Sequence, residues 1–211
     1  MTLRLNGSNS GFTEVKAPAT AGSNTLILPT SNGSANQVLR NGSTAGTLEF
    51  ATPFQLAKGT KVDTTSGTTV DFTSIPSYAK RITVMFDGVS CTANALLGLR
   101  IGDSGGIETS GYVSGCFTTA STNGFENSTV RFILTHNSMN QLSNGYYGSV
   151  ILTNLDGNSW ASQGVLHAAT TYGAPAANSG TKTLSGTLDR LQIAFTSGNF
   201  DAGQINIMYE G

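Results

Sequence analysis

Turn-forming residues interrupt this sequence so often that its apolar runs stay short. Asn6-Gly7 and Asn41-Gly42 are typical interruptions, and 26 of the 211 residues are glycine. Glycine and asparagine tolerate the backbone angles of tight turns, whereas a helix needs an unbroken stretch of good helix formers such as Ala, Leu, Glu and Lys. The chain has no long stretch of that kind. The pattern therefore predicts an all-β chain of many short strands.

The same sequence is too apolar in places to be disordered. Recurrent runs such as Arg81–Phe86 and Thr129–Thr135 are rich in Val, Ile and Phe, which a solvated tail lacks. Charged residues make up 11% of the chain, against roughly 25% in an ordinary soluble protein. We therefore expect a folded protein with a neutral, hydroxyl-rich surface.

Charge and cysteine content argue against several classes of function. The formal net charge is −1 and the basic residues are scattered, so we expect no nucleic-acid partner. The sequence has neither the apolar core of a signal peptide nor a membrane span, which predicts no membrane partner and folding in the cytosol. Without an export signal, Cys91 and Cys116 are expected to be free thiols. We expect no metal or other cofactor, because metal-ligand spacings are missing.

Residues 1–57 form a segment of distinct character. Their apolar residues come in four brief bursts, which predict strands of about four residues; the bursts lie at 12–15, 25–28, 37–39 and 48–50. Four such strands cannot bury enough apolar surface to offset the loss of chain entropy. We expect identical copies to wrap about one axis, so that this segment forms a short intertwined stem.

Residues 58–211 predict a β-sandwich, resembling a jelly roll, because longer strands recur with turns between them. The strands are expected near residues 68–75, 81–88, 95–102, 110–118, 129–135, 146–155, 160–168, 181–185, 187–196 and 203–209. In the last of these, Ile205, Ile207 and Tyr209 share one face, which indicates one buried and one polar side. The continuous apolar run at 148–152 predicts a strand that is covered on both faces.

The motif that most suggests an enzyme is Gly102-Asp-Ser-Gly-Gly106, which matches the surroundings of the serine protease nucleophile. That chemistry needs a histidine and an aspartate, which in this protease family lie upstream of the serine, but His136 and His167 both lie downstream and are interpreted as structural. The glycines instead favour a tight turn. The acidic residues are isolated, so turn capping is favoured over the paired carboxylates of a polysaccharide depolymerase. We expect no enzymatic activity and no catalytic residue.

Aromatic residues near expected loops are the better candidates for a binding surface. Tyr and Trp rings offer flat faces to sugar C–H groups, while nearby Asn, Asp and Thr can bind hydroxyls. The tentative receptor-binding set is Tyr112, Tyr146, Tyr147, Trp160 and Tyr172. For Tyr147 and Trp160, a place in the core is the alternative interpretation.

Two parts of the chain resemble one family of proteins. Residues 15–40 contain an Ala-Pro-Ala stretch, a strand ending in Leu28-Pro29 and then Gln37-Val-Leu39, followed by a turn and Phe50. This order resembles a segment of tail-fibre and related structural proteins of marine phages and cyanophages. The stretches 84–90, 101–112, 184–190 and 200–207 look like the C-terminal domain of the same proteins.

The resemblance implies a homotrimeric structural protein of the virion. Its N-terminal segment would attach to other virion proteins, either of the tail or baseplate or of the capsid, and its C-terminal domain, residues 58–211, would face the host. The first hypothesis is a short trimeric tail fibre that binds a host surface glycan, with avidity over many copies supplying attachment. A head fibre or capsid decoration protein is the alternative, and a depolymerase is a third hypothesis.

Overall fold

The computed structural model describes residues 2–119, 124–139, 145–169 and 175–211, and over these residues the protein is all-β. The helical part of the described chain is one 3₁₀ turn, Asn137–Met139, and no described helix has the length and apolar character to cross a membrane. The chain divides into two compact units, Met1–Pro53 and Phe54–Gly211. The second begins ahead of residue 58 because β5 (Leu56–Lys58) pairs with β18 (Phe200–Glu210).

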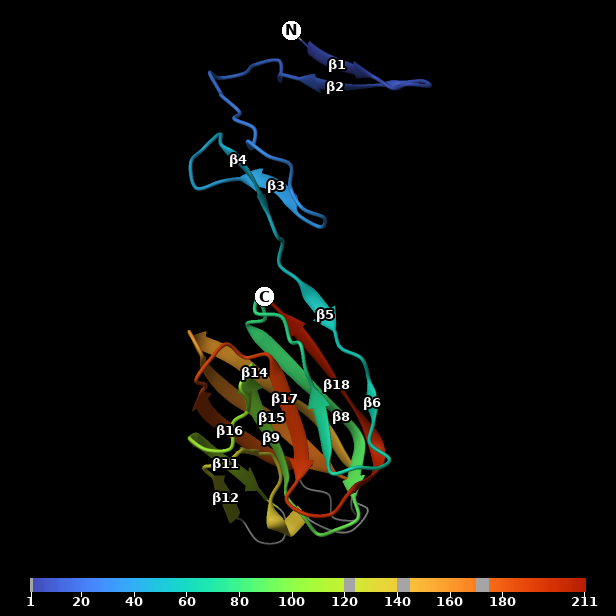
Figure 1. Ribbon diagram of the computed structural model, residues 1–211, viewed down its shortest axis with the longest axis vertical. Helices are drawn as coiled ribbons and strands as arrows, with labels where there is room; N and C mark the ends of the chain where they lie inside the picture. Colours follow the sequence, from blue (N-terminus) through green and yellow to red (C-terminus); the bar gives the residue numbers. More distant parts are fainter. Residues whose placement is uncertain (1, 120–123, 140–144, 170–174) are drawn as a thin grey trace. The chain divides into compact units, whose positions relative to one another are not determined.

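The unit Met1–Pro53 consists of two separate β-hairpins (Figure 1). Strands β1 (Thr2–Asn6) and β2 (Phe12–Lys16) form the first, and β3 (Val38–Asn41) and β4 (Leu48–Ala51) form the second. The expected strand at 25–28 is reduced to one bridge between Ile27 and Thr47, whereas β1 was not expected. None of residues 3–53 is buried, so this unit has no hydrophobic core of its own.

The unit Phe54–Gly211 contains two larger antiparallel sheets, of which one is a half-barrel. The nine-stranded sheet has the order β12 (Gly124–Ser128), β11 (Tyr112–Thr118), β16 (Pro175–Thr183), β15 (Ser159–Ala168), β14 (Tyr146–Asp156), β8 (Arg81–Cys91), β18 and β5, with β6 (Val62–Asp63) also paired to β18. The five-stranded sheet has the order β10 (Gly106–Ile107), β9 (Leu97–Asp103), β17 (Arg190–Phe195) and β7 (Thr69–Phe72), with β13 (Phe132–Ile133) paired to β9. Figure 1 shows β8 beside β18 and β14.

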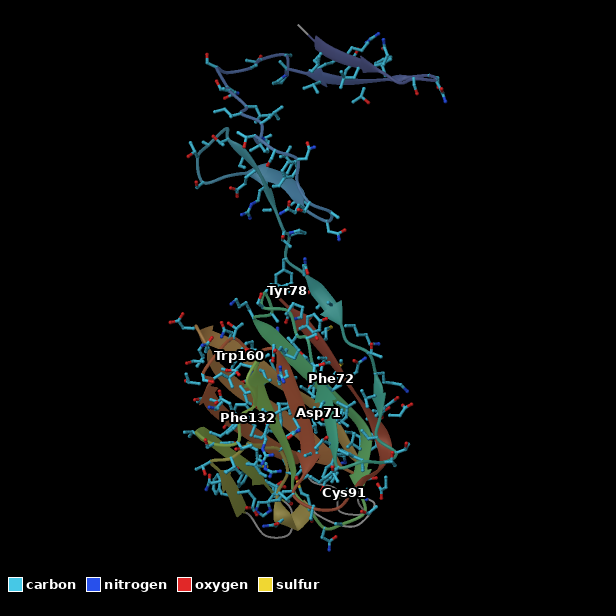
Figure 2. All side chains as sticks on the ribbon, viewed as in Figure 1. Asp71, Phe72, Tyr78, Cys91, Phe132 and Trp160 are labelled. Carbon is cyan, nitrogen blue, oxygen red and sulfur yellow. The ribbon has the colours of Figure 1, made fainter. Side chains whose placement is uncertain are left out.

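The two sheets share one hydrophobic core. Alternate residues of β8, from Ile82 to Phe86, are buried, and so are Leu191 and Ile193 of β17. All of them belong to the same cluster of buried side chains, in which Phe132 and Trp160 also lie (Figure 2). Because side chains alternate along a strand, the remaining residues of the nine-stranded sheet point away from this core.

Strong alternation of apolar and polar residues predicted most strands correctly, and the strands that were predicted wrongly lack such alternation. Strands β8, β11, β14, β15 and β18 lie close to their expected positions. The strand expected at 181–185 is instead Pro175–Thr183, and β12 was not expected. In the strand at 148–152, Val150 and Leu152 are buried whereas Ser149 and Ile151 are half-buried on the opposite face. The expectation that an oligomer contact covers this second face stays a prediction.

Tyr112 contacts three parts of the C-terminal unit, two through its hydroxyl and one through its ring. The hydroxyl accepts the Ile101 N–H at 2.9 Å and donates to the Glu108 carbonyl at 2.9 Å. Its ring packs edge-on against Phe132, with ring centroids 5.0 Å apart. Burial raises the pKa of Tyr112 to about 12, so the hydroxyl keeps its proton at neutral pH.

We predict that Tyr112→Phe lowers the free energy of unfolding by about 1–3 kcal/mol, because the Ile101 N–H loses its partner in a buried site. The matched control is Tyr78→Phe. Tyr78 is only half-buried and its hydroxyl makes no hydrogen bond to a described residue, so its change should stay within about 0.5 kcal/mol. Urea unfolding measures both values. Equal losses in the two variants would contradict this role of the Tyr112 hydroxyl.

Candidate functional site

The four described residues among the aromatic set proposed for receptor binding do not form a common surface. Tyr112, Tyr146 and Trp160 are buried in the core, so their proposed place on the binding surface was wrong: a buried ring offers no face to a sugar. Tyr172 lies outside the described residues. Tyr147 is 42% exposed and pairs across the strands with His167 on the outer face of the nine-stranded sheet.

The motif Gly102–Gly106 forms the predicted turn, between β9 and β10. Asp103 pairs with Gly106 across the turn, and its carboxylate accepts the Gly105 N–H at 2.8 Å. Ser185 supplies a hydroxyl 2.8 Å from the same carboxylate, and this hydrogen bond is the main reason that the pKa of Asp103 lies below its usual range. Ser104 is exposed and makes no side-chain hydrogen bond to a described residue.

The two cysteines and the two histidines lie on different segments of the C-terminal unit. Cys91 and Cys116 are both free and buried, as predicted, and burial raises the pKa of Cys116 to about 12. His136 is buried with its Nε2 atom 4.0 Å from the Glu126 carboxylate, whereas His167 is exposed on β15. The described residues contain no group of three or more His, Cys, Asp or Glu side chains that could hold a metal ion.

A groove lies on the outer face of the nine-stranded sheet, over β12, β11, β16, β15 and β14. Its volume is about 780 Å³, and it continues into a second hollow of about 440 Å³ that shares Gly115, Asn127, Gln163 and Ser179 with it. We call the two hollows together the sheet groove. It is an open surface feature that faces away from the hydrophobic core.

The sheet groove exists because small residues occupy the middle of the sheet. On the central strand β16, the outward residues beside the groove are Ala177 and Ser179. Gly115 of β11 lies opposite Ser179. Larger side chains flank this floor on both sides, namely Phe117 and Phe125 from β11 and β12 on one side and Gln163 and Val165 from β15 on the other. A floor of small residues between taller walls gives a depression.

The lining of the sheet groove is uncharged but chemically mixed. None of its described lining residues is Asp, Glu, Lys, Arg or His. The Phe125 side chain is 74% exposed, and its ring centroid lies 5.2 Å from that of Phe117. Asn127 and Gln163 make no side-chain hydrogen bond to any described residue. The groove therefore offers aromatic faces together with free amide donors and acceptors.

Sequence reasoning missed this surface because it depended on strands that were not expected. Phe125 lies on β12 and the floor residues Ala177 and Ser179 lie on β16, the strand whose position was wrong. The only signal in the sequence was the pair Phe117 and Phe125, which are close along the chain and meet across one hairpin.

We predict that Asp103 stabilises the turn and takes no part in catalysis. Since its folded pKa is lowered, its contribution is present above its unfolded value of about 4 and is lost as the pH falls through the folded value. Stability measured from neutral pH to about pH 3 should therefore fall less steeply in Asp103→Asn than in the natural chain. Ser104→Ala should leave the profile unchanged, and a steeper fall in Asp103→Asn would contradict this role.

Comparisons with known proteins assign no family or function to this chain. They found no match among protein-family models, curated proteins or solved structures. The function therefore has to be argued from the surfaces described above.

Proposed function

We propose that this chain is a non-enzymatic structural protein of a virus particle. In this proposal it is a short trimeric tail fibre. The N-terminal unit associates with the same unit of other copies and attaches the fibre to the particle, and the C-terminal unit binds host surface glycans. The observation that carries the proposal is the unit Met1–Pro53, which has no buried side chain among residues 3–53. The resemblance of residues 15–50 to phage fibre segments supports the same assignment.

The N-terminal unit lacks a source of stability within one chain. Ordering a residue costs roughly 1–2 kcal/mol of conformational entropy, which folded proteins offset mainly by burying apolar surface. A two-stranded hairpin without such burial is marginal in water. The large apolar side chains of this unit stay exposed, among them Leu3, Leu5, Phe12, Val15, Leu26, Ile27, Leu28, Val38, Leu39 and Phe50.

The first hairpin places its aliphatic side chains on one face and its charged side chains on the other, where the Arg4 guanidinium carbon also lies 3.8 Å from the centroid of the Phe12 ring. Leu3 pairs with Val15 and shares its face with Leu5. On the other face, Glu14 forms ion pairs with both Arg4 and Lys16, and these hydrogen bonds, that of Lys16 first, hold the pKa of Glu14 below its usual range. The charges are satisfied within the hairpin, whereas the apolar face is left uncovered.

In the second hairpin the charged pair and the largest apolar pair also lie on opposite faces, although Val38 and Ala51 share the face of the charged pair. Arg40 and Glu49 pair across the strands with their charged groups 3.1 Å apart, while Leu39 and Phe50 pair on the opposite face. An uncovered apolar face with no unmatched charge suits a partner that is also apolar and neutral. Further copies of the same chain supply such faces at equal concentration and can close about an axis, which favours self-association over a different partner.

The Gly102–Gly106 turn supports a structural protein over a serine hydrolase. Hydrogen bonds from Gly105 and Ser185 fix the Asp103 carboxylate within the turn. Lys182 forms an ion pair with Glu108, which also accepts from Ser185, and it donates to the Thr183 carbonyl at 2.7 Å. These groups satisfy one another, which is how structural polar residues behave in a folded domain.

We predict that the purified full chain sediments as a trimer, and that Leu3→Asp combined with Leu5→Asp weakens association about tenfold or more. The expected cause is that two carboxylates would have to be buried between copies. Leu155→Asp is the matched control, because Leu155 is 62% exposed, close to the 61% of Leu3, but lies in the C-terminal unit. Sedimentation equilibrium measures the mass, and a monomeric natural chain would contradict the proposal.

Attachment is tested separately from assembly. The purified trimer should compete with the virus particle for adsorption to host cells. A monomeric variant should need a higher concentration for half-maximal inhibition, because it loses the avidity of the trimer. A trimer that assembles but does not reduce adsorption would overturn the attachment function.

A further inference from the structure

We propose that the sheet groove is a binding site for an uncharged polysaccharide chain. This inference rests on the proposed attachment function and deepens it, because it places glycan contact on residues that differ from the aromatic set expected from sequence.

Strand register arranges the outer face into one apolar row and one polar row. Residues directly opposite in antiparallel strands point to the same side of the sheet. Pairing therefore aligns Phe125, Phe117, Ala177 and Val165 across β12, β11, β16 and β15. The neighbouring row, two residues along each strand, contains Asn127, Gly115, Ser179 and Gln163. An aromatic and aliphatic row thus runs beside an amide and hydroxyl row.

This pairing of rows matches the two kinds of surface on a sugar. A pyranose ring presents C–H groups that pack on aromatic faces and hydroxyl groups that need hydrogen-bond partners. Phe117 and Phe125 supply the first, with rings tilted by 43° to one another. Asn127 and Gln163 supply amide donors and acceptors that make no hydrogen bond to a described residue.

The extent of the rows favours a chain over a single sugar. From β12 to β15 the rows cross three inter-strand spacings of about 4.8 Å each, or about 14 Å. The floor residues Gly115, Ala177 and Ser179 carry at most a hydroxymethyl group, so a ligand can approach the sheet closely along this distance. An open groove of this length accommodates several linked sugars.

The uncharged lining selects against other occupants. Anionic polysaccharides and nucleic acids bind through Lys and Arg, which are absent from the described lining. A second copy of this chain would bury Asn127 and Gln163 and would have to satisfy their amides, whereas a hydroxyl-rich ligand does so directly. The occupant that fits best is therefore a neutral glycan.

The test measures binding of the full chain to dextran, mannan, galactan and cellohexaose as uncharged probes and to alginate and heparin as anionic probes. We expect binding to at least one uncharged probe. Phe125→Ala should weaken this binding about tenfold, because the loss of one aromatic contact changes an affinity by roughly that factor. Ser179→Trp should abolish it by filling the floor. Leu155→Ala, an exposed apolar residue outside the groove, should leave it unchanged.

Three results of the binding measurements would overturn the inference. They are binding to none of the uncharged probes, preference for the anionic probes, and equal binding by Phe125→Ala and the natural chain. A lower oligomer mass in Phe125→Ala would also overturn it and assign the groove to contact between copies. If the Phe125→Ala trimer still competes fully with virus for host cells, the groove assignment fails while the attachment function stands. If the natural trimer does not compete, the attachment function itself fails.

Discussion

The shared hydrophobic core between the two sheets of Phe54–Gly211 is the constraint on which the outer surface depends. Core packing holds Ile82, Val84 and Phe86 inward on β8, and Val150 and Leu152 inward on β14. Because a strand cannot slip by one residue without exchanging its faces, burial of one set fixes the exposure of the other. The aromatic and polar rows of the sheet groove are therefore a consequence of the packing on the opposite face.

The unit Met1–Pro53 has no such core, and the proposed function rests on this difference between the two units. Its two hairpins have paired backbones and satisfied charges, with Arg4, Glu14 and Lys16 on one hairpin and Arg40 and Glu49 on the other. What they lack is a cover for their apolar faces. A protein with one self-sufficient unit and one dependent unit suits assembly into a larger particle, where copies complete the dependent part.

Much of the fold could be predicted from sequence, and the binding surface could not. Alternation in Arg81–Phe86 and in Gly203–Tyr209 identified strands that the structure contains. The position of the strand Pro175–Thr183 was predicted wrongly because its residues are mostly small and polar and show no alternation of large apolar residues. Tyr146 and Tyr147 are adjacent, so they point to opposite faces of the sheet, and Tyr146 shares the buried face of Val150 and Leu152. The groove brings together Phe125, Ala177 and Gln163 through register, which a single sequence does not specify.

The central claim is that copies of this chain complete the N-terminal unit. An electron cryomicroscopy map of the assembled full chain tests it most directly. The account predicts three copies around one axis, with Leu3, Leu5 and Val15 of each copy packed against the others and the Arg4–Glu14 pairs on the outside. A map in which the hairpins stand apart, with these apolar side chains in solvent, would contradict it.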